Sequence, residues 1–156
     1  VHGRDHVWIG TSASRVLRST DGGRSWSATA TPVATGASTG IFSIAFRDAQ
    51  HGIVVGGDYR KEGDAVDNAA VTGDGGRTWQ AVKGLSGFRS VVAYLPGGPS
   101  PTLIAVGPQG ADQSTDDGRT WTPVTGATGL HTLAIAKRGR AGWGAGENGR
   151  ILRLTY

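Results

Sequence analysis

The chain repeats one segment, Ser19-Thr20-Asp21-Gly22-Gly23-Arg24-Ser25-Trp26, twice more along its length. It returns as Thr72-Gly73-Asp74-Gly75-Gly76-Arg77-Thr78-Trp79 and as Ser114-Thr115-Asp116-Asp117-Gly118-Arg119-Thr120-Trp121. We call these segments boxes 1 to 3, and their shared pattern is [S/T]-x-D-x-G-R-[S/T]-W. Their aspartates are 53 and 42 residues apart (74 − 21 and 116 − 74). The fold is therefore expected to repeat one structural unit of about that length.

A fourth, partial copy of the unit ends the chain. Trp8-Ile9-Gly10 and Arg15–Arg18 precede box 1, and they align with Trp143-Gly144-Ala145 and Arg150–Arg153. Tyr156 then stands where a fourth box would begin. A period of ~40 to 50 residues is typical of one four-stranded blade of a β-propeller.

Short β-branched and aromatic runs between glycine-rich segments predict fourteen strands and no helix of useful length. We name the strands of a blade a to d from the ring axis outwards. The strand d that follows each box is expected to begin at Ser25, Thr78 and Thr120. The predicted fold is all-β, a propeller of four-stranded antiparallel blades. The predicted partial propeller spans residues 1–156. The first blade has strands b to d in 7–28, two whole blades occupy 41–82 and 88–124, and the last blade has strands a to c in 131–154. We expect about three and a half blades of a seven-bladed ring, closed by missing N-terminal blades or by another copy of the chain.

Each box has the chemistry of a hairpin turn. An aspartate carboxylate accepts nearby backbone N–H groups, and glycine adopts the positive φ that the turn requires. The tryptophan is large enough to wedge into the apolar layer beside the turn. We therefore assign structural roles, with the tryptophans in the core, to Asp21, Gly23, Trp26, Asp74, Gly76, Trp79, Asp116, Gly118 and Trp121. Trp8 and Trp143 are expected to pack as well, whereas a carbohydrate-binding platform would need some tryptophans exposed.

Composition excludes several function classes. The net charge is +4 and the pI about 10.0, but the basic residues are scattered, so a nucleic-acid partner is not expected. The chain has no cysteine, which excludes disulfides and thiolate chemistry. No apolar run approaches the ~18 residues of a transmembrane helix.

The boxes resemble the Asp-box, or bacterial neuraminidase, repeat of sialidases, sortilin-type receptors and photosystem II assembly factors. The segments 40–58 and 142–151 resemble a group of bacterial propellers that carry oxidoreductase-like or photosystem-assembly-factor-like names, mostly without a demonstrated activity. Those relatives are about twice as long, so the resemblance implies that this chain is a C-terminal half. It also implies export to the periplasm or the exterior of a bacterium.

The residues do not provide an obvious enzyme site. Sialidases use an arginine triad, a Tyr and Glu pair and an acid/base Asp, and these cannot be placed among three tyrosines and two glutamates. An oxidoreductase needs a cofactor site, and neither a phosphate-binding glycine loop nor a repeated histidine is present. A glycoside hydrolase, or an oxidoreductase-like protein, with its site on absent blades remains the alternative.

No metal or cofactor is expected. Asp112, Asp116 and Asp117 lie close in the sequence, but their spacing fails the EF-hand pattern. The regular boxes favour carboxylates that cap backbone N–H groups over carboxylates that bind calcium.

The preferred function is a non-catalytic scaffold that binds a protein or a small ligand through loops. Antiparallel strands put the c–d turns, with the boxes, and the a–b turns on one face, and the b–c and d–a loops on the other. The b–c connection of the second blade holds most of the extra length of the first repeat interval. It could be a tolerated insertion, or it could form a binding rim with 31–39 and 84–87. Its candidate residues are Asp58, Tyr59, Arg60, Lys61, Glu62, Asp64 and Asp67.

Overall fold

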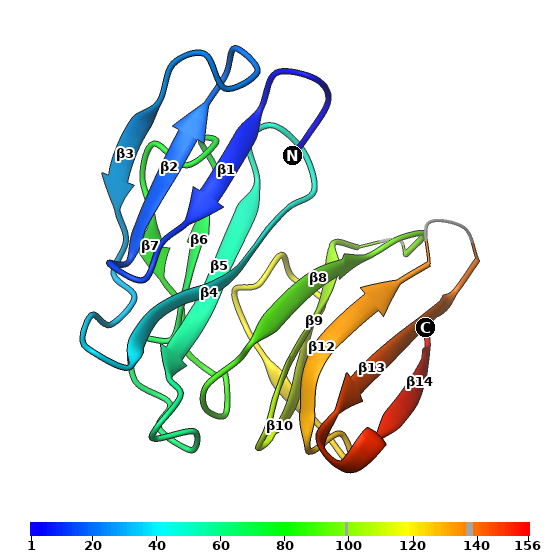
Figure 1. The fold of residues 1–156 in the computed structure, drawn as a ribbon. Coiled ribbons are helices and arrows are strands. Elements are labelled where there is room, and N and C mark those ends of the chain that lie inside the picture. Colours follow the sequence, from blue (N-terminus) through cyan, green and yellow to red (C-terminus); the bar gives the residue numbers. More distant parts are fainter. Residues whose placement is uncertain (99, 137–138) are drawn as a thin grey trace.

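A computed structural model describes residues 1–98, 100–136 and 139–156 (Figure 1). Pro99, Lys137 and Arg138, in the a–b connections of the third and fourth blades, lie outside the described residues. The described chain forms fourteen strands. They are β1 (Val7–Gly10), β2 (Arg15–Ser19), β3 (Ser27–Ala30), β4 (Thr39–Phe46), β5 (Gly52–Asp58), β6 (Ala69–Thr72), β7 (Gln80–Ala81), β8 (Val91–Leu95), β9 (Thr102–Gly107), β10 (Gly110–Ser114), β11 (Thr122–Val124), β12 (Leu130–Ile135), β13 (Ala141–Gly146) and β14 (Ile151–Thr155).

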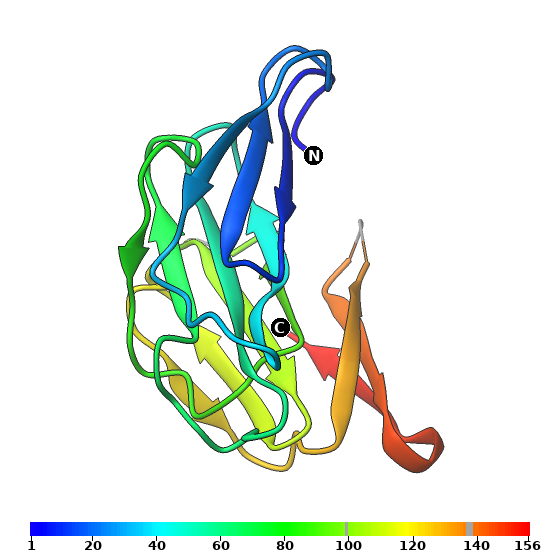
Figure 2. The same cartoon turned by 60° about the vertical axis from the view of Figure 1, so that its left-hand side comes forward.

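The strands make four antiparallel sheets in which chain neighbours pair with each other. The orders are β1-β2-β3, β4-β5-β6-β7, β8-β9-β10-β11 and β12-β13-β14. The first strands of successive sheets lie side by side, with β4 next to β8 and β8 next to β12. The sheets therefore fan out as blades around a common side (Figures 1 and 2). The predicted all-β, partial propeller is confirmed.

The strand that follows each box begins later than the sequence predicts. The sequence analysis starts these strands at Ser25, Thr78 and Thr120, but they begin at Ser27, Gln80 and Thr122. The hydroxyls of the three earlier residues bond back to the box aspartates, so these residues still belong to the turn.

The core consists of three apolar layers, one between each pair of successive blades. The middle layer combines Ile53 and Val55 of β5 with Leu103 and Ala105 of β9. Val54, between the first two, points to the other side of β5 and packs in the layer shared with the first blade. A strand covered on both faces buries successive residues, which explains the unbroken apolar run of β5.

The two ends of the blades carry different loops. The box turns lie at the upper ends in Figure 1, and the b–c and d–a loops lie at the lower ends. Among the described residues, helical structure is limited to a 3₁₀ turn in the last b–c loop, Glu147–Gly149. No described helix could therefore span a membrane.

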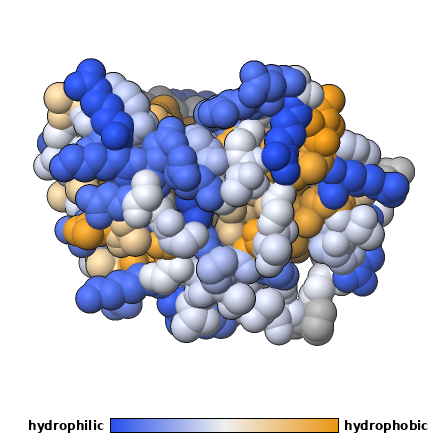
Figure 3. All heavy atoms as spheres, turned by 90° about the horizontal axis from the view of Figure 1, so that it is seen from below, coloured by the Kyte–Doolittle hydropathy of each residue, from blue (hydrophilic) through white to orange (hydrophobic). Residues whose placement is uncertain are grey.

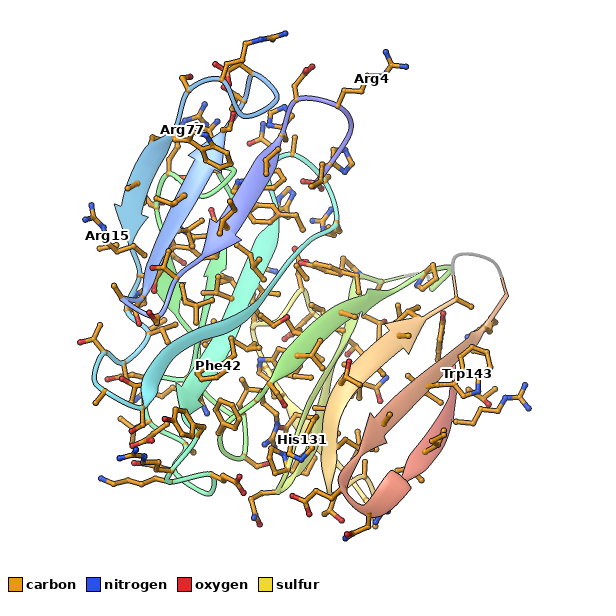
Figure 4. All side chains as sticks on the ribbon, viewed as in Figure 1. Arg4, Arg15, Phe42, Arg77, His131 and Trp143 are labelled. Carbon is orange, nitrogen blue, oxygen red and sulfur yellow. The ribbon has the colours of Figure 1, made fainter. Side chains whose placement is uncertain are left out.

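Backbone bulges at the lower ends turn two inner-strand side chains outwards. The register of β4 against β5 shifts between Ile41 and Ser43, and that of β12 against β13 shifts between Leu130 and Thr132. Phe42 and His131 occupy these bulges and are exposed on the strands nearest the centre (Figure 4). Bulges often redirect a side chain towards a functional surface.

Candidate functional site

Each box turn is held by its aspartate. In box 2, Asp74 Oδ1 accepts the backbone N–H groups of Arg77 and Thr78, both at 2.9 Å, and Oδ2 accepts the Thr78 hydroxyl at 2.6 Å. The Thr72 hydroxyl donates to Oδ1 at 2.8 Å. The corresponding groups of boxes 1 and 3 make the same bonds to Asp21 and Asp116. These contacts account for the first, third and seventh positions of the shared pattern.

The remaining polar positions of the pattern also have local partners. The Arg77 guanidinium donates to the carbonyl of Asp74 at 2.9 Å, and the N–H of Gly76 donates to the Thr72 hydroxyl at 2.9 Å. Gly76 has φ 88°, a conformation that favours glycine. The pattern therefore describes a self-contained turn.

The hydrogen bonds keep the box carboxylates ionised. Burial raises the pKa of Asp74, but the hydroxyl and backbone N–H of Thr78 outweigh it and bring the pKa to about 2. The same combination lowers the pKa of Asp116, and the bonds from Ser25 lower that of Asp21. A general acid requires a raised pKa, so these groups have the opposite character.

Replacing Asp74 with alanine should lower the free energy of unfolding by about 1 to 2 kcal/mol, because several turn donors lose their acceptor. Asp64→Ala is the matched control, since Asp64 is an exposed loop aspartate. Urea denaturation of both variants and the parent measures the difference. Equal stability of the two variants would contradict the role of Asp74 in the turn.

The box tryptophans differ in burial, contrary to the expectation that all three lie in the core. Trp121 is buried and Trp79 is half-buried, but Trp26 is 44% exposed. Two of the box tryptophans pack on the preceding blade: Trp121 contributes to the layer with Ile53, and Trp79 lies against the layer of Trp8. The described chain places no blade before Trp26, which explains its exposure.

The two b-strand tryptophans differ for the same reason. Trp8 is 5% exposed, because the second blade covers it, and the expectation that it packs is confirmed. Trp143, at the corresponding position of the last blade, is 46% exposed, so the expectation that it packs is wrong. Its indole points away from the other blades (Figure 4). Both exposed tryptophans therefore lie on the outward faces of the end blades.

An ion-pair network between the second and third blades was not anticipated. Arg47 contacts both carboxylate oxygens of Asp117, at 3.1 and 3.0 Å, and the Tyr94 hydroxyl donates to the same carboxylate at 2.9 Å. Burial, and then the bond to Asp117, raise the pKa of Tyr94. Asp117 has φ 66°, and boxes 1 and 2 have glycine at the same position. The aspartate in place of this glycine was the one sign of the network in the sequence.

A pocket of about 250 Å³ lies beside this network, between boxes 2 and 3. Its two carboxylates, Asp74 and Asp117, are both committed to protein donors, and both have lowered pKa values. Among the described residues, this pocket therefore lacks the protonated carboxyl group that a glycosidase uses as general acid.

The three aspartates considered for calcium have separate partners. Asp112 is fully buried and bonded to Arg89 Nε at 2.8 Å and to the Ser86 hydroxyl at 2.9 Å. Asp116 holds its turn, and Asp117 binds Arg47. Among residues 1–98, 100–136 and 139–156, no cluster of three metal-ligating side chains occurs.

The b–c loop of the second blade is bonded to one segment predicted to share its rim, 31–39, and to Phe88, the residue that follows the other segment, 84–87. The carbonyl of Asp67 accepts the N–H of Ala34 at 2.8 Å, and the carbonyl of Glu62 accepts the N–H of Phe88 at 2.9 Å. A tolerated insertion was one of the two interpretations of this loop in the sequence analysis, but these bonds show that the loop satisfies neighbouring backbone groups. Deleting the loop would therefore also disturb the fold.

Exposed aromatic side chains gather beside this loop. Phe42 and Tyr59 are 45% and 43% exposed, and their ring centroids are 6.0 Å apart in an edge-on arrangement. Phe88 lies edge-on to Phe42 at 4.7 Å, and the guanidinium carbon of Arg60 lies 5.9 Å from the Tyr59 ring centre. We call Phe42, Tyr59 and Phe88 the aromatic rim.

A second pocket opens on the same face. It has a volume of about 470 Å³ and is formed by the b–c loops of the third and fourth blades and the connection between those blades. Its polar lining includes Gln109, Glu147 and Arg150. Gln109 donates to Glu62 at 3.0 Å, which links the pocket to the loop beside the aromatic rim. Figure 3 views this face from below, where hydrophilic side chains surround smaller apolar areas.

The remaining predicted loop residues belong to the surface around the rim. Asp58 Oδ1 accepts the N–H of Arg60 at 2.9 Å, which shapes the start of the loop. Lys61, Asp64 and Asp67 are exposed. The structure thus brings the candidate loop residues together with Phe42 and Gln109, which the sequence analysis missed because neither lies in a recognisable motif.

The sequence matches no known protein family and no curated protein. Solved structures similar to the chain include YCF48 bound to D1 peptide, at 18% identity and TM-score 0.62, covering 97% of this chain and 52% of that one. YCF48 from Cyanidioschyzon merolae has 15% identity and TM-score 0.60, with 96% and 52% covered. An ancestral GH74 enzyme has 19% identity and TM-score 0.70, with 96% and 22% covered.

These similar structures are propellers. At such low identity the likeness shows the fold alone. The chain spans about half the length of the YCF48 structures and a smaller share of the GH74 enzyme.

Proposed function

We propose that the chain is a non-catalytic Asp-box propeller unit that binds an extended peptide segment of a protein partner on the face opposite the boxes. The aromatic rim carries the proposal, because two large aromatic side chains remain exposed there although the surrounding loop is tied to the fold. Aromatic residues of this kind commonly dominate peptide and protein interfaces. The rim would accept an apolar side chain, and the pocket with Glu147 and Arg150 would accept polar groups of the same peptide.

Two further observations support this assignment. A similar propeller, YCF48, has been solved with a D1 peptide bound, so a propeller of this kind can act as a peptide receptor. The box residues, in contrast, are engaged with one another, and their carboxylates have lowered pKa values. The boxes therefore shape the scaffold and leave recognition to the opposite loops.

Hydrolysis of a glycosidic bond is the less favoured alternative. A glycosidase needs one carboxyl group with a raised pKa near a second carboxylate. Among the described residues, every carboxyl group with a resolved shift has a lowered pKa.

A random 12-residue peptide library displayed on phage tests the proposal. Synthetic copies of the enriched peptides are titrated against the parent chain and against the double variant Phe42→Ser and Tyr59→Ser, with fluorescence anisotropy as the readout. We expect the dissociation constant to rise about tenfold or more, because two exposed anchors are lost together.

The matched control is Arg77→Ser, which changes an exposed residue of box 2 on the opposite face. This variant should bind the same peptides as the parent does. The proposal would be contradicted if the peptides bound the rim variant as tightly as the parent but bound Arg77→Ser more weakly. That result would assign recognition to the box face.

A further inference from the structure

The last three blades share one backbone arrangement at the end opposite the boxes. In each of them a glycine of strand b lies against a carbonyl of the segment that enters the inner strand. The glycines are Gly56, Gly107 and Gly146, and the carbonyls belong to Gly40, Phe88 and Gly129. The residues two positions after these carbonyls are therefore equivalent, and they are Phe42, Ser90 and His131. We call these three residues the inner row.

The inner row follows the side around which the blades fan out. The N–H of Val92 donates to the Ser43 hydroxyl at 3.1 Å, which holds β8 against β4, and β12 lies next to β8. Phe42 and His131 are exposed, and Figure 4 shows them near the lower ends of the inner strands. Since Phe42 is exposed with a blade on each side of its own, this position faces solvent in a flanked blade.

The inner row begins at the aromatic rim and ends at a carboxylate. Oε1 of Glu147 lies 3.4 Å from Nε2 of His131. In residues 1–98, 100–136 and 139–156, no lysine or arginine forms an ion pair with Glu147. The guanidinium of Arg150, in the same pocket, donates to the carbonyl of Gly126 at 2.9 Å. Glu62, which accepts a hydrogen bond from Gln109, adds a second carboxylate beside this pocket.

The exposure of Glu147 is a property of its loop. The loops 11–15 and 146–150 close with the same hydrogen bond, from the N–H of the first residue to the carbonyl of the last, at 3.0 Å. Ser12 therefore corresponds to Glu147. Ser12 is exposed although the second blade follows its own. A side chain at this place is thus open to solvent beside a neighbouring blade as well.

We propose that the peptide bound at the aromatic rim is basic, and that it crosses the inner row with an apolar side chain on Phe42 and a lysine or arginine side chain on Glu147. This inference rests on the proposed function and adds the charge and the path of the peptide. The small side chain of Ser90 leaves room for a backbone between the two contacts. An ammonium or guanidinium group would give Glu147 a charge-assisted hydrogen bond. An acidic segment would instead bring its carboxylate towards Glu147 and Glu62.

The charge is tested with the peptides selected from the phage library, which should carry a lysine or arginine close to an apolar residue. One such peptide, and a copy with glutamine in place of the basic residue, are titrated against the parent and against Glu147→Gln by fluorescence anisotropy. Each single change should weaken binding about two- to fivefold, the range of an exposed ion pair. Both changes together should weaken it no further, because they remove the same contact.

The matched control is Asp5→Asn, which removes the same charge from an exposed residue beside box 1. This variant should bind the peptide as the parent does. An equal loss of affinity in Asp5→Asn and Glu147→Gln would overturn the proposed contact, because it would reduce the effect to the net charge of the chain.

The path is tested by disulfide trapping, since the chain has no cysteine of its own. A copy of the peptide with a cysteine beside its basic residue is mixed with His131→Cys or with Thr35→Cys, a variant at an exposed residue of the segment 31–39. We expect a mixed disulfide with His131→Cys and none with Thr35→Cys, because a disulfide requires the two Cβ atoms to come within about 4.5 Å.

Failure of this inference can be told apart from failure of the proposed function. Peptides that lose affinity for the Phe42→Ser and Tyr59→Ser double variant, but bind Glu147→Gln as tightly as the parent, would overturn the inference alone. Selection of acidic peptides, or trapping by Thr35→Cys in place of His131→Cys, would do the same. A selection that yields no rim-dependent peptide would overturn both.

Discussion

Replacing Asp112 with alanine is expected to lower the free energy of unfolding by about 3 to 5 kcal/mol, because the change leaves a fully buried charge without its partner. Arg89 and Asp112 are both 0% exposed. The guanidinium bonds to the carboxylate, to the Ser86 hydroxyl and to the carbonyl of Phe88. Without Asp112, a buried arginine would keep only part of this network.

The pair joins the connection between the second and third blades to strand β10. Ser86 donates both its backbone N–H and its hydroxyl to Asp112, so the carboxylate positions the loop that carries Leu85 into the core. The control is Glu147→Ala, which removes the partner of His131 from an exposed pair at 3.4 Å. This variant should change stability by less than about 1 kcal/mol, as exposed pairs usually do. Similar losses in the two variants, measured by urea denaturation, would contradict the role of the buried pair.

Trp121→Ala is expected to cost about 3 to 5 kcal/mol, the usual range for removing a buried tryptophan. The ring fills the layer between the second and third blades, and its N–H donates to the carbonyl of Gly118 at 3.0 Å. The loss would open a cavity beside Ile53 and Val55, which belong to the same layer.

Trp26→Ala is the matched comparison, since Trp26 holds the same place in box 1 and makes the same bond, at 2.9 Å to Gly23. With 44% of the residue exposed, its removal should cost about 1 kcal/mol or less. Thermal and urea denaturation of the two variants measure the contrast. Equal costs would show that a box tryptophan stabilises its own turn rather than the contact with the preceding blade.

The repeat predicted the fold because its information is local. In box 2, the serine/threonine, aspartate and arginine positions of the shared pattern bond within five residues of the aspartate, so the pattern can be read as a turn without any tertiary knowledge. The alternation and spacing of the strands followed from the same period.

The features that the sequence could not predict depend on contacts between neighbouring blades. Trp8 and Trp143 occupy equivalent positions, and one is buried while the other is exposed, because only one of them has a covering blade in the described chain. Arg47 and Asp117 are 70 residues apart, and Arg89 and Asp112 are 23 apart, so no local motif announces either pair. The aromatic rim was missed in part because Phe42 reads as an ordinary strand residue until a bulge turns it outwards.

Hydrogen–deuterium exchange with a selected peptide bound tests most directly whether the working surface lies opposite the boxes. The account predicts slower exchange in residues 34–42, 58–67 and 84–88 when the peptide is present, because these backbone segments meet at the aromatic rim. Exchange in the box turns at 19–26, 72–79 and 114–121 should remain as in the free chain. Protection confined to the box turns, with the rim segments unchanged, would contradict the account.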